Sequence, residues 1–235
     1  MRREIWIGVV VLVLGLIAPL QAGVVSVSGT AIIWGAGNST TAPDGQATPP
    51  PSITFGLGSV SSILFSGFSG SVKYAPGATQ NGAEGQAGAT NFNPYGGISG
   101  IQFDGRQFFL VGVFLGPGAA TGTAPAKLAY TATSANSSVF NPLLAQVFFI
   151  GDGLGTGSTQ QTFNVPTGAT RLFWGFTDGI GSTPGTYGDN SGSLNFTYTL
   201  NELNQSLVVS TPEPSTIVLM GLGIAALTLL RRRRA

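Results

Sequence analysis

Oxygen-bearing side chains are concentrated in one segment between two predicted strands. Asp178 and Asp189 supply carboxylates near its two ends, and Asn190 adds an amide oxygen. Gly185 and Gly188 would let backbone carbonyls turn towards a common point, because glycine adopts conformations that are closed to other residues. Calcium takes about six to eight oxygen ligands of these kinds. The segment therefore predicts a calcium site, although Asp, Asn and Gly are also ordinary turn residues.

Two short motifs carry a resemblance to a known family. The stretch Pro184-Gly185-Thr186-Tyr187-Gly188-Asp189-Asn190-Ser191-Gly192-Ser193 resembles the calcium loop of the galactophilic PA-I-type bacterial lectins. Lys73-Tyr74-Ala75-Pro76 is similar to a second segment of that family, Ser-Tyr-Gly-Pro. The resemblance implies a jelly-roll-like β-sandwich that binds Ca²⁺, with two sugar hydroxyls completing the coordination of the metal.

The resemblance also implies a ligand set. Calcium would be held by the backbone carbonyls of Tyr74 and Thr186 and by the side chains of Asp178, Asp189 and Asn190, with Thr186 and Asp189 also at the sugar.

The chain departs from the family at three points. Asp189 stands where the family has Asn, which adds a negative charge. Five residues separate Asp178 from Pro184, where the family has one. The family places a His against the sugar, and this chain contains no His. The identity of the sugar therefore stays open.

Composition excludes several classes of site. The chain has no Cys and no His, so disulfides, Cys/His zinc sites and triads with a His base cannot form. Six of its ten basic residues lie at the termini, which leaves four cations against seven acids between them. No basic patch exists for nucleic acid. A glycosidase would need two carboxylates about 5–9.5 Å apart in a cleft. The acids lie mostly in Gly-rich turns, so we expect no enzyme.

The N-terminus has the pattern of a secretion signal. Met-Arg-Arg-Glu precedes an apolar run from Ile5 to Ala18, and a basic start followed by a short apolar stretch is typical of signal peptides. We expect a signal helix within residues 1–22, with cleavage after Ala22 or, alternatively, after Ala18. A retained membrane anchor is the other interpretation.

The C-terminus combines three features in order: Pro212-Glu213-Pro214, an apolar run from Ile217 to Leu230, and four arginines, Arg231, Arg232, Arg233 and Arg234. The arginines favour a cytoplasmic end under the positive-inside rule. Residues 211–235 closely resemble the PEP-CTERM sorting signal, which implies a transmembrane helix and processing by an exosortase. It also implies a Gram-negative, exopolysaccharide-producing bacterium. An ordinary tail anchor is the alternative.

Residues 23–210 alternate short apolar runs with turn residues, which predicts an all-β sandwich. Leu194–Leu200 alternates with period two, typical of a strand with one buried face. Phe108–Leu115 is continuously apolar and predicts a central strand. The other expected strands are Val24–Trp34, Ser52–Phe55, Val60–Phe65, Ser69–Tyr74, Gln146–Ile150, Thr162–Val165 and Arg171–Thr177.

The remaining segments are expected to be connections or core. Asn38–Pro51 and Gly77–Tyr95 have the composition of loops, and Gly151–Gly157 that of a Gly-rich connection between strands rather than a phosphate loop. The aromatic residues that could stack on a sugar ring are expected in the core, because they lie inside strands: Phe148, Phe149, Phe173 and Trp174.

Together these features predict an exported surface or extracellular protein, held in the inner membrane until an exosortase processes it. Its domain would bind carbohydrate or exopolysaccharide through calcium. The alternative is a structural protein of the biofilm or exopolysaccharide matrix that keeps a lectin-like scaffold without binding sugar.

Overall fold

The computed structural model describes residues 21–38 and 45–203. Within these residues the secondary structure is strands and four single turns of 3-10 helix. The 3-10 turns are η1 (Ile33–Gly35), η2 (Ser134–Asn136), η3 (Thr156–Ser158) and η4 (Tyr187–Asp189). The all-β prediction is confirmed for this part of the chain.

One layer is a five-stranded sheet, antiparallel except where β8 pairs with β10. Its strands, in order across the sheet, are β1 (Gln21–Ser28), β14 (Ser191–Glu202), β3 (Val60–Lys73), β10 (Thr162–Asn164) and β8 (Val139–Phe140). The long strands β3 and β14 run side by side along nearly their whole length.

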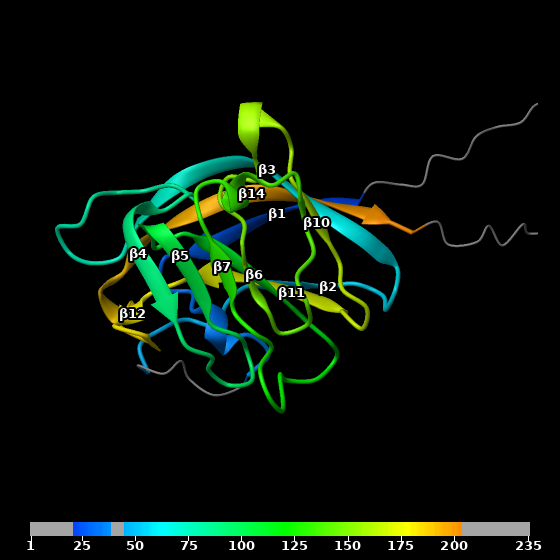
Figure 1. The fold of residues 1–235 in the computed structure, drawn as a ribbon, viewed down its shortest axis with the longest axis horizontal. Coiled ribbons are helices and arrows are strands. Elements are labelled where there is room, and N and C mark those ends of the chain that lie inside the picture. The colour runs from blue at the N-terminus through cyan, green and yellow to red at the C-terminus, as the bar shows by residue number, and fades with distance from the viewer. Residues whose placement is uncertain (1–20, 39–44, 204–235) are drawn as a thin grey trace, which may run out of the picture. The chain divides into compact units, whose positions relative to one another are not determined.

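The second layer is a four-stranded antiparallel sheet. Its strands, in order, are β2 (Ser52–Thr54), β11 (Arg171–Phe176), β6 (Leu110–Leu115) and β9 (Val147–Phe149). Two smaller sheets complete the described fold (Figure 1). They are formed by β4 (Gln86–Phe92), β5 (Ile101–Gln107) and β7 (Leu128–Tyr130), and by β12 (Gly179–Ile180) and β13 (Thr183–Pro184).

Aromatic rings join the two larger sheets. Trp174 of β11 contacts Phe65 of β3 and Phe196 of β14, with ring centroids 6.4 and 5.8 Å apart. Phe148 of β9 meets Phe163 of β10 at 5.6 Å. Aromatic pairs of this kind each add about 0.5–1.5 kcal/mol beyond the area that they bury. The two sheets therefore pack face to face, as the layers of a β-sandwich.

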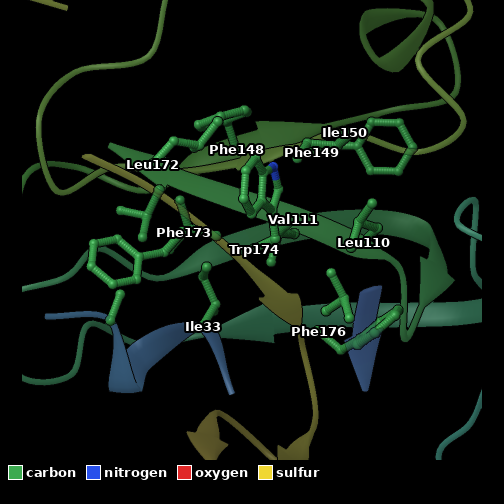
Figure 2. Close-up of a cluster of buried hydrophobic side chains, with 14 of the residues drawn as sticks. Ile33, Leu110, Val111, Phe148, Phe149, Ile150, Leu172, Phe173, Trp174 and Phe176 are labelled. Carbon is green, nitrogen blue, oxygen red and sulfur yellow. The ribbon is translucent and has the colours of Figure 1, made fainter. Parts of the chain in front are cut away.

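The predicted central strand and the predicted core aromatics are confirmed. Every residue of β6 is buried, and the strand lies between β11 and β9. Figure 2 shows Val111 of β6 among the buried side chains Phe148, Phe149, Phe173 and Trp174. The strand begins at Leu110 and not at Phe108, because Phe108 has a positive φ of 50° and cannot continue a strand there.

The alternation predicted at Leu194–Leu200 is also confirmed. Leu194, Phe196 and Leu200 of β14 are buried, and the residues between them are partly exposed. The two strands predicted at Val60–Phe65 and Ser69–Tyr74 form a single strand, β3. An irregularity in its pairing with β14 lies at the interruption between them.

Two predictions from the sequence are corrected. Gly77–Tyr95 is not a loop throughout, because β4 occupies its second half and pairs with β5 along seven residues. The small residues Ala87, Gly88 and Ala89 obscure the alternation of buried and exposed positions that would predict a strand. Val24–Trp34 is not one strand, since the chain turns after Ser28 and enters η1.

Predictions for the termini lie outside the described residues: the signal helix, the transmembrane run Ile217–Leu230 and the sorting motif. Among residues 21–38 and 45–203 no helix is long and apolar enough to cross a membrane. Strand β1 begins at Gln21, so both Gln21 and Ala22 belong to the sheet. The jelly-roll connectivity stays a prediction.

Candidate functional site

Tyr187 links the end of β11 to the segment that precedes β14. Its side chain is fully buried. The Tyr187 hydroxyl donates a hydrogen bond to the carbonyl oxygen of Phe176 (2.7 Å) and accepts one from the backbone N–H of Asp178 (2.9 Å). Because both bonds involve backbone atoms, Tyr187 fixes the position from which the Asp178 side chain projects.

The extra residues between Asp178 and Pro184 form a small hairpin. Gly179 pairs with Pro184 and Ile180 with Thr183, as β12 and β13. The N–H of Gly185 donates to the carbonyl oxygen of Asp178 (3.1 Å), which closes the base of the hairpin. The additional length therefore leaves Asp178 beside the Pro-Gly-Thr-Tyr segment.

Glycine is needed at position 179. A Cβ atom there would collide with the carbonyl oxygen of Thr183 across the hairpin. The hairpin is also anchored from outside, because the N–H of Asn93 donates to the carbonyl oxygen of Ser182 (2.9 Å).

Tyr74 and Asn190 meet through the register of β3 and β14. Lys73 is paired with Ser191, and Tyr74 and Asn190 each lie one position beyond that pair. The Asn190 side chain is 7% exposed and donates from Nδ2 to the carbonyl oxygen of Gly29 (3.0 Å). Its Oδ1 is buried without a hydrogen-bond partner, an arrangement that costs about 1–3 kcal/mol unless something else binds the oxygen.

Thr186 adopts a strained backbone conformation. Its φ of 66° and ψ of 26° place it in the left-handed region, which is unfavourable for a β-branched residue. The Thr186 hydroxyl donates to the carbonyl oxygen of Gly185 (2.7 Å). Asp189, at the end of η4, is exposed to solvent. The segment thus holds one strained and one exposed predicted ligand.

The structure brings the five predicted ligand residues to one end of the sandwich. We call this end the rim; it consists of Tyr74, Asp178, Thr186, Asp189 and Asn190. Tyr74 and Asp178 also line a hollow of about 320 Å³, whereas the other three lie in the adjoining segment and do not line it. Among the described residues no three acidic, His or Cys side chains form a cluster, so the rim offers two carboxylates.

The sequence did not predict the other residues that line this hollow. Its opposite wall comes from residues 89–92 of β4 and from Gln107 at the end of β5. Thr90 and Asn91 fall in the stretch expected to be a loop, so nothing placed them near Asp178. The one signal in the sequence is weak: Thr90 and Phe92, both residues that favour strands, lie two positions apart, and the structure buries both.

A second charged cluster lies away from the rim and serves the fold. Glu84 forms an ion pair with Arg106, and its Oε1 also accepts a hydrogen bond from the N–H of Asp152 (3.0 Å). The Arg106 guanidinium lies 5.5 Å from the ring centroid of Phe103 and 5.8 Å from that of Phe149. Burial lowers the pKa of Arg106, and the charge of Asp152 partly opposes this. The cluster ties β5 to the connection after β9.

The described part of the chain is an all-β domain. The family comparison identifies a motif in the sequence that follows this domain. Residues 210–234 match the PEP-CTERM protein-sorting motif. The match spans Pro212, Glu213, Pro214 and the run Arg231–Arg234. The motif implies an exported protein that is targeted to an exosortase and processed at the membrane.

No curated protein and no solved structure has significant similarity to the chain. The likeness to PA-I-type lectins therefore rests on the motif at Pro184–Ser193 and on the segment around Tyr74.

Proposed function

We propose that the exported domain binds calcium at the rim and, through the metal, carbohydrate outside the inner membrane. The ion would be coordinated by the backbone carbonyls of Tyr74 and Thr186 and by side-chain oxygens of Asp178, Asp189 and Asn190. The mature protein would then act at the cell surface or in the extracellular matrix, with exopolysaccharide as the partner. The proposal assigns binding and no catalysis.

The buried Oδ1 of Asn190 is the observation that carries the proposal. A buried amide oxygen without a hydrogen-bond partner lowers the stability of the fold. Such an oxygen is a suitable ligand for calcium. The strain at Thr186 supports the same assignment, because residues held in sparsely populated conformations cluster at ligand sites. The hairpin β12–β13 removes the objection from chain length, since Asp178 is hydrogen-bonded to Gly185.

Calorimetry of the mature protein with CaCl₂ tests the metal. We expect saturable binding at one site and, at calcium one hundred times the dissociation constant, about 2.7 kcal/mol of added stability. If the calorimetric titration shows no heat of binding and calcium leaves the melting temperature unchanged, the proposal is wrong.

Graded variants locate the ion. Asp189→Ala should abolish binding, whereas Asp189→Asn, which keeps an oxygen ligand, should only weaken it. Because Asp189 is exposed, neither change should unfold the domain. Asp104→Ala is the matched control, since Asp104 is an exposed aspartate of β5 outside the rim. Equal affinities for Asp189→Ala and Asp104→Ala would place the ion elsewhere.

A glycan array separates sugar binding from the structural alternative. Calcium-dependent binding that EDTA reverses supports the proposed function. If calcium raises the melting temperature but no glycan binds, the domain is a calcium-stabilised structural protein of the biofilm or exopolysaccharide matrix.

A further inference from the structure

Strand β1 forms one edge of the five-stranded sheet and is the longest edge strand among the described sheets, with eight residues. The N–H of Gly29, directly after the strand, donates to the carbonyl oxygen of Gly192 (2.9 Å). Residues that bond to the neighbouring strand alternate along an antiparallel pair. Ala22, Val24 and Ser26, which are out of phase with Gly29, therefore turn their backbone N–H and C=O groups away from β14.

These three residues are all exposed, and Val24 is the most exposed of them as an apolar side chain, at 77%. Within residues 21–38 and 45–203, strand β1 pairs with β14 alone, and no other backbone group bonds to Ala22, Val24 or Ser26. The outer side of β1 thus presents a row of donors and acceptors to solvent, which is the template for adding another strand.

Strand β1 lacks the features that usually block such an edge. It contains no charged residue and no proline, and its eight pairs with β14 run without a bulge. The other edge of the same sheet, β8, is blocked by its length of two residues. Strand β4 is also a long edge, but Asn93, the residue after it, is bonded to the β12–β13 hairpin.

A second copy of β1 is complementary to this edge. When two copies run antiparallel with Val24 opposite Ser26 of the other copy, two residue pairs exchange about four hydrogen bonds. The strand carries no charge, so the two copies meet no like-charge repulsion. The exposed Val24 side chains approach each other across the axis and leave water. This register uses residues after Ala22, so it is compatible with signal cleavage after either Ala18 or Ala22.

We propose that two copies of the exported protein associate through antiparallel pairing of β1 about a two-fold axis at Val25, which joins their five-stranded sheets into one. A single strand pair buries less than the about 1,200 Å² typical of stable complexes, so the dimer is weak and concentration-dependent. Ser28 lies at the rim end of β1, and antiparallel pairing therefore places two rims at opposite ends of the dimer. The use of these rims for carbohydrate rests on the proposed function, whereas the pairing does not.

Sedimentation equilibrium of the mature protein in EDTA tests the pairing, at concentrations from about 10 µM to about 1 mM, which covers weak complexes. Val24→Pro removes the outward N–H without breaking a bond to β14, and proline is tolerated on edge strands. We expect it to weaken dimerisation at least about tenfold, or about 1.4 kcal/mol. Val24→Thr, the matched control, keeps the N–H and the branched Cβ and should stay within about threefold of wild type.

A monomer at every concentration, or equal dimerisation of Val24→Pro and Val24→Thr, would overturn the inference. Because the buffer contains EDTA, a dimer that binds neither calcium nor carbohydrate would leave the inference standing and reject the proposed function.

Spin labels provide a measurement that does not depend on the proline variant. The chain has no cysteine, so Ser26→Cys carries a single label. In the proposed register the two Ser26 α-carbons lie roughly 8 Å apart, and the EPR spectrum should show dipolar broadening that dilution with unlabelled protein removes. Val139→Cys, at the exposed opposite edge β8, is the control and should show none. A dimer without broadening at Ser26→Cys would mean that another surface forms the interface.

Discussion

At the scale of single residues, the fold places ionisable groups in the core as well as at its surface. Tyr130 is 5% exposed and packs against Phe103, Phe140 and Phe149. Its hydroxyl accepts a hydrogen bond from the N–H of Phe149 (3.3 Å). Burial is the main influence on the phenol, and it raises the pKa of Tyr130 above its ordinary value. The phenolate is therefore disfavoured in the folded state.

This shift predicts a loss of stability in alkali. A group whose pKa is raised by folding contributes stability that is complete below its unfolded pKa, about 10 for tyrosine, and is lost as the pH rises beyond it. Tyr130→Phe removes the titration but leaves the N–H of Phe149 without its acceptor, which should cost about 1 kcal/mol at pH 7. Urea unfolding between pH 7 and 11 should show the gap from wild type narrowing above about pH 10.

Tyr95→Phe provides the control for this series, because Tyr95 is 43% exposed. Its stability should follow that of the wild type at every pH. A gap between Tyr130→Phe and wild type that stays constant or widens in alkali would contradict the assignment.

At the scale of elements, the β12–β13 hairpin is an addition to the rim and not a part of it. Deleting residues 180–183 leaves Gly179 alone between Asp178 and Pro184. Because the hydrogen bond from Gly185 to Asp178 already closes the hairpin base, we expect calcium affinity to stay within about threefold of wild type, under 1 kcal/mol. Calorimetry measures this, and the melting temperature should fall slightly as the bonds from Asn93 to Ser182 are lost.

A folded deletion variant without calcium binding would show that the hairpin itself positions Asp178. Ser182→Ala is the control, since it removes the side-chain bond to Asn93 and retains the hairpin. It should leave calcium affinity unchanged.

At the scale of the whole domain, the rim lies at one end of β14, and the two ends of the described domain, Gln21 and Leu203, lie at the other. Gln21 pairs with Leu200 near one end of the strand, and Tyr74 adjoins the other end at Ser191. The twelve residues of β14 are separated by eleven steps of about 3.3 Å, which places these ends roughly 36 Å apart. Glu202, the last residue of β14, thus lies at the end of the strand that is remote from the rim.

Single cysteines can test this arrangement, because the chain has none of its own. Ile180, at the rim end, and Leu57, near the Leu203 end, are similarly exposed at 76% and 70%. With full-length protein in lipid nanodiscs, a bulky maleimide should label Ile180→Cys as fast as in the released protein. Leu57→Cys should react at least about twofold more slowly in nanodiscs than after release, since its end is tethered.

We expect equal labelling rates for the two variants in the released protein, and these rates serve as the reference. Stronger protection of Ile180→Cys than of Leu57→Cys in nanodiscs would mean that the rim faces the membrane.

Sequence patterns predicted the strands whose burial is regular. The continuous apolar run indicated β6, because a strand buried on both faces needs apolar residues at every position. The alternation at Leu194–Leu200 indicated most of β14. Strand β4 was missed because Gly88 and its alanine neighbours carry no strong periodic signal, and its pairing with β5 stabilises it instead. Because β4 was not predicted, its contribution to the pocket wall at Asn91 was not predicted either.

The sequence by itself determined the all-β class, the exclusion of His- and Cys-based chemistry and the sorting motif, since these depend on composition and local pattern. Tertiary structure alone decided that Tyr74 adjoins Asn190, that the extra residues after Asp178 pair as a hairpin, and that β4 lines a pocket together with Thr177. These depend on strand register and on contacts between residues far apart in the chain, which local periodicity does not encode.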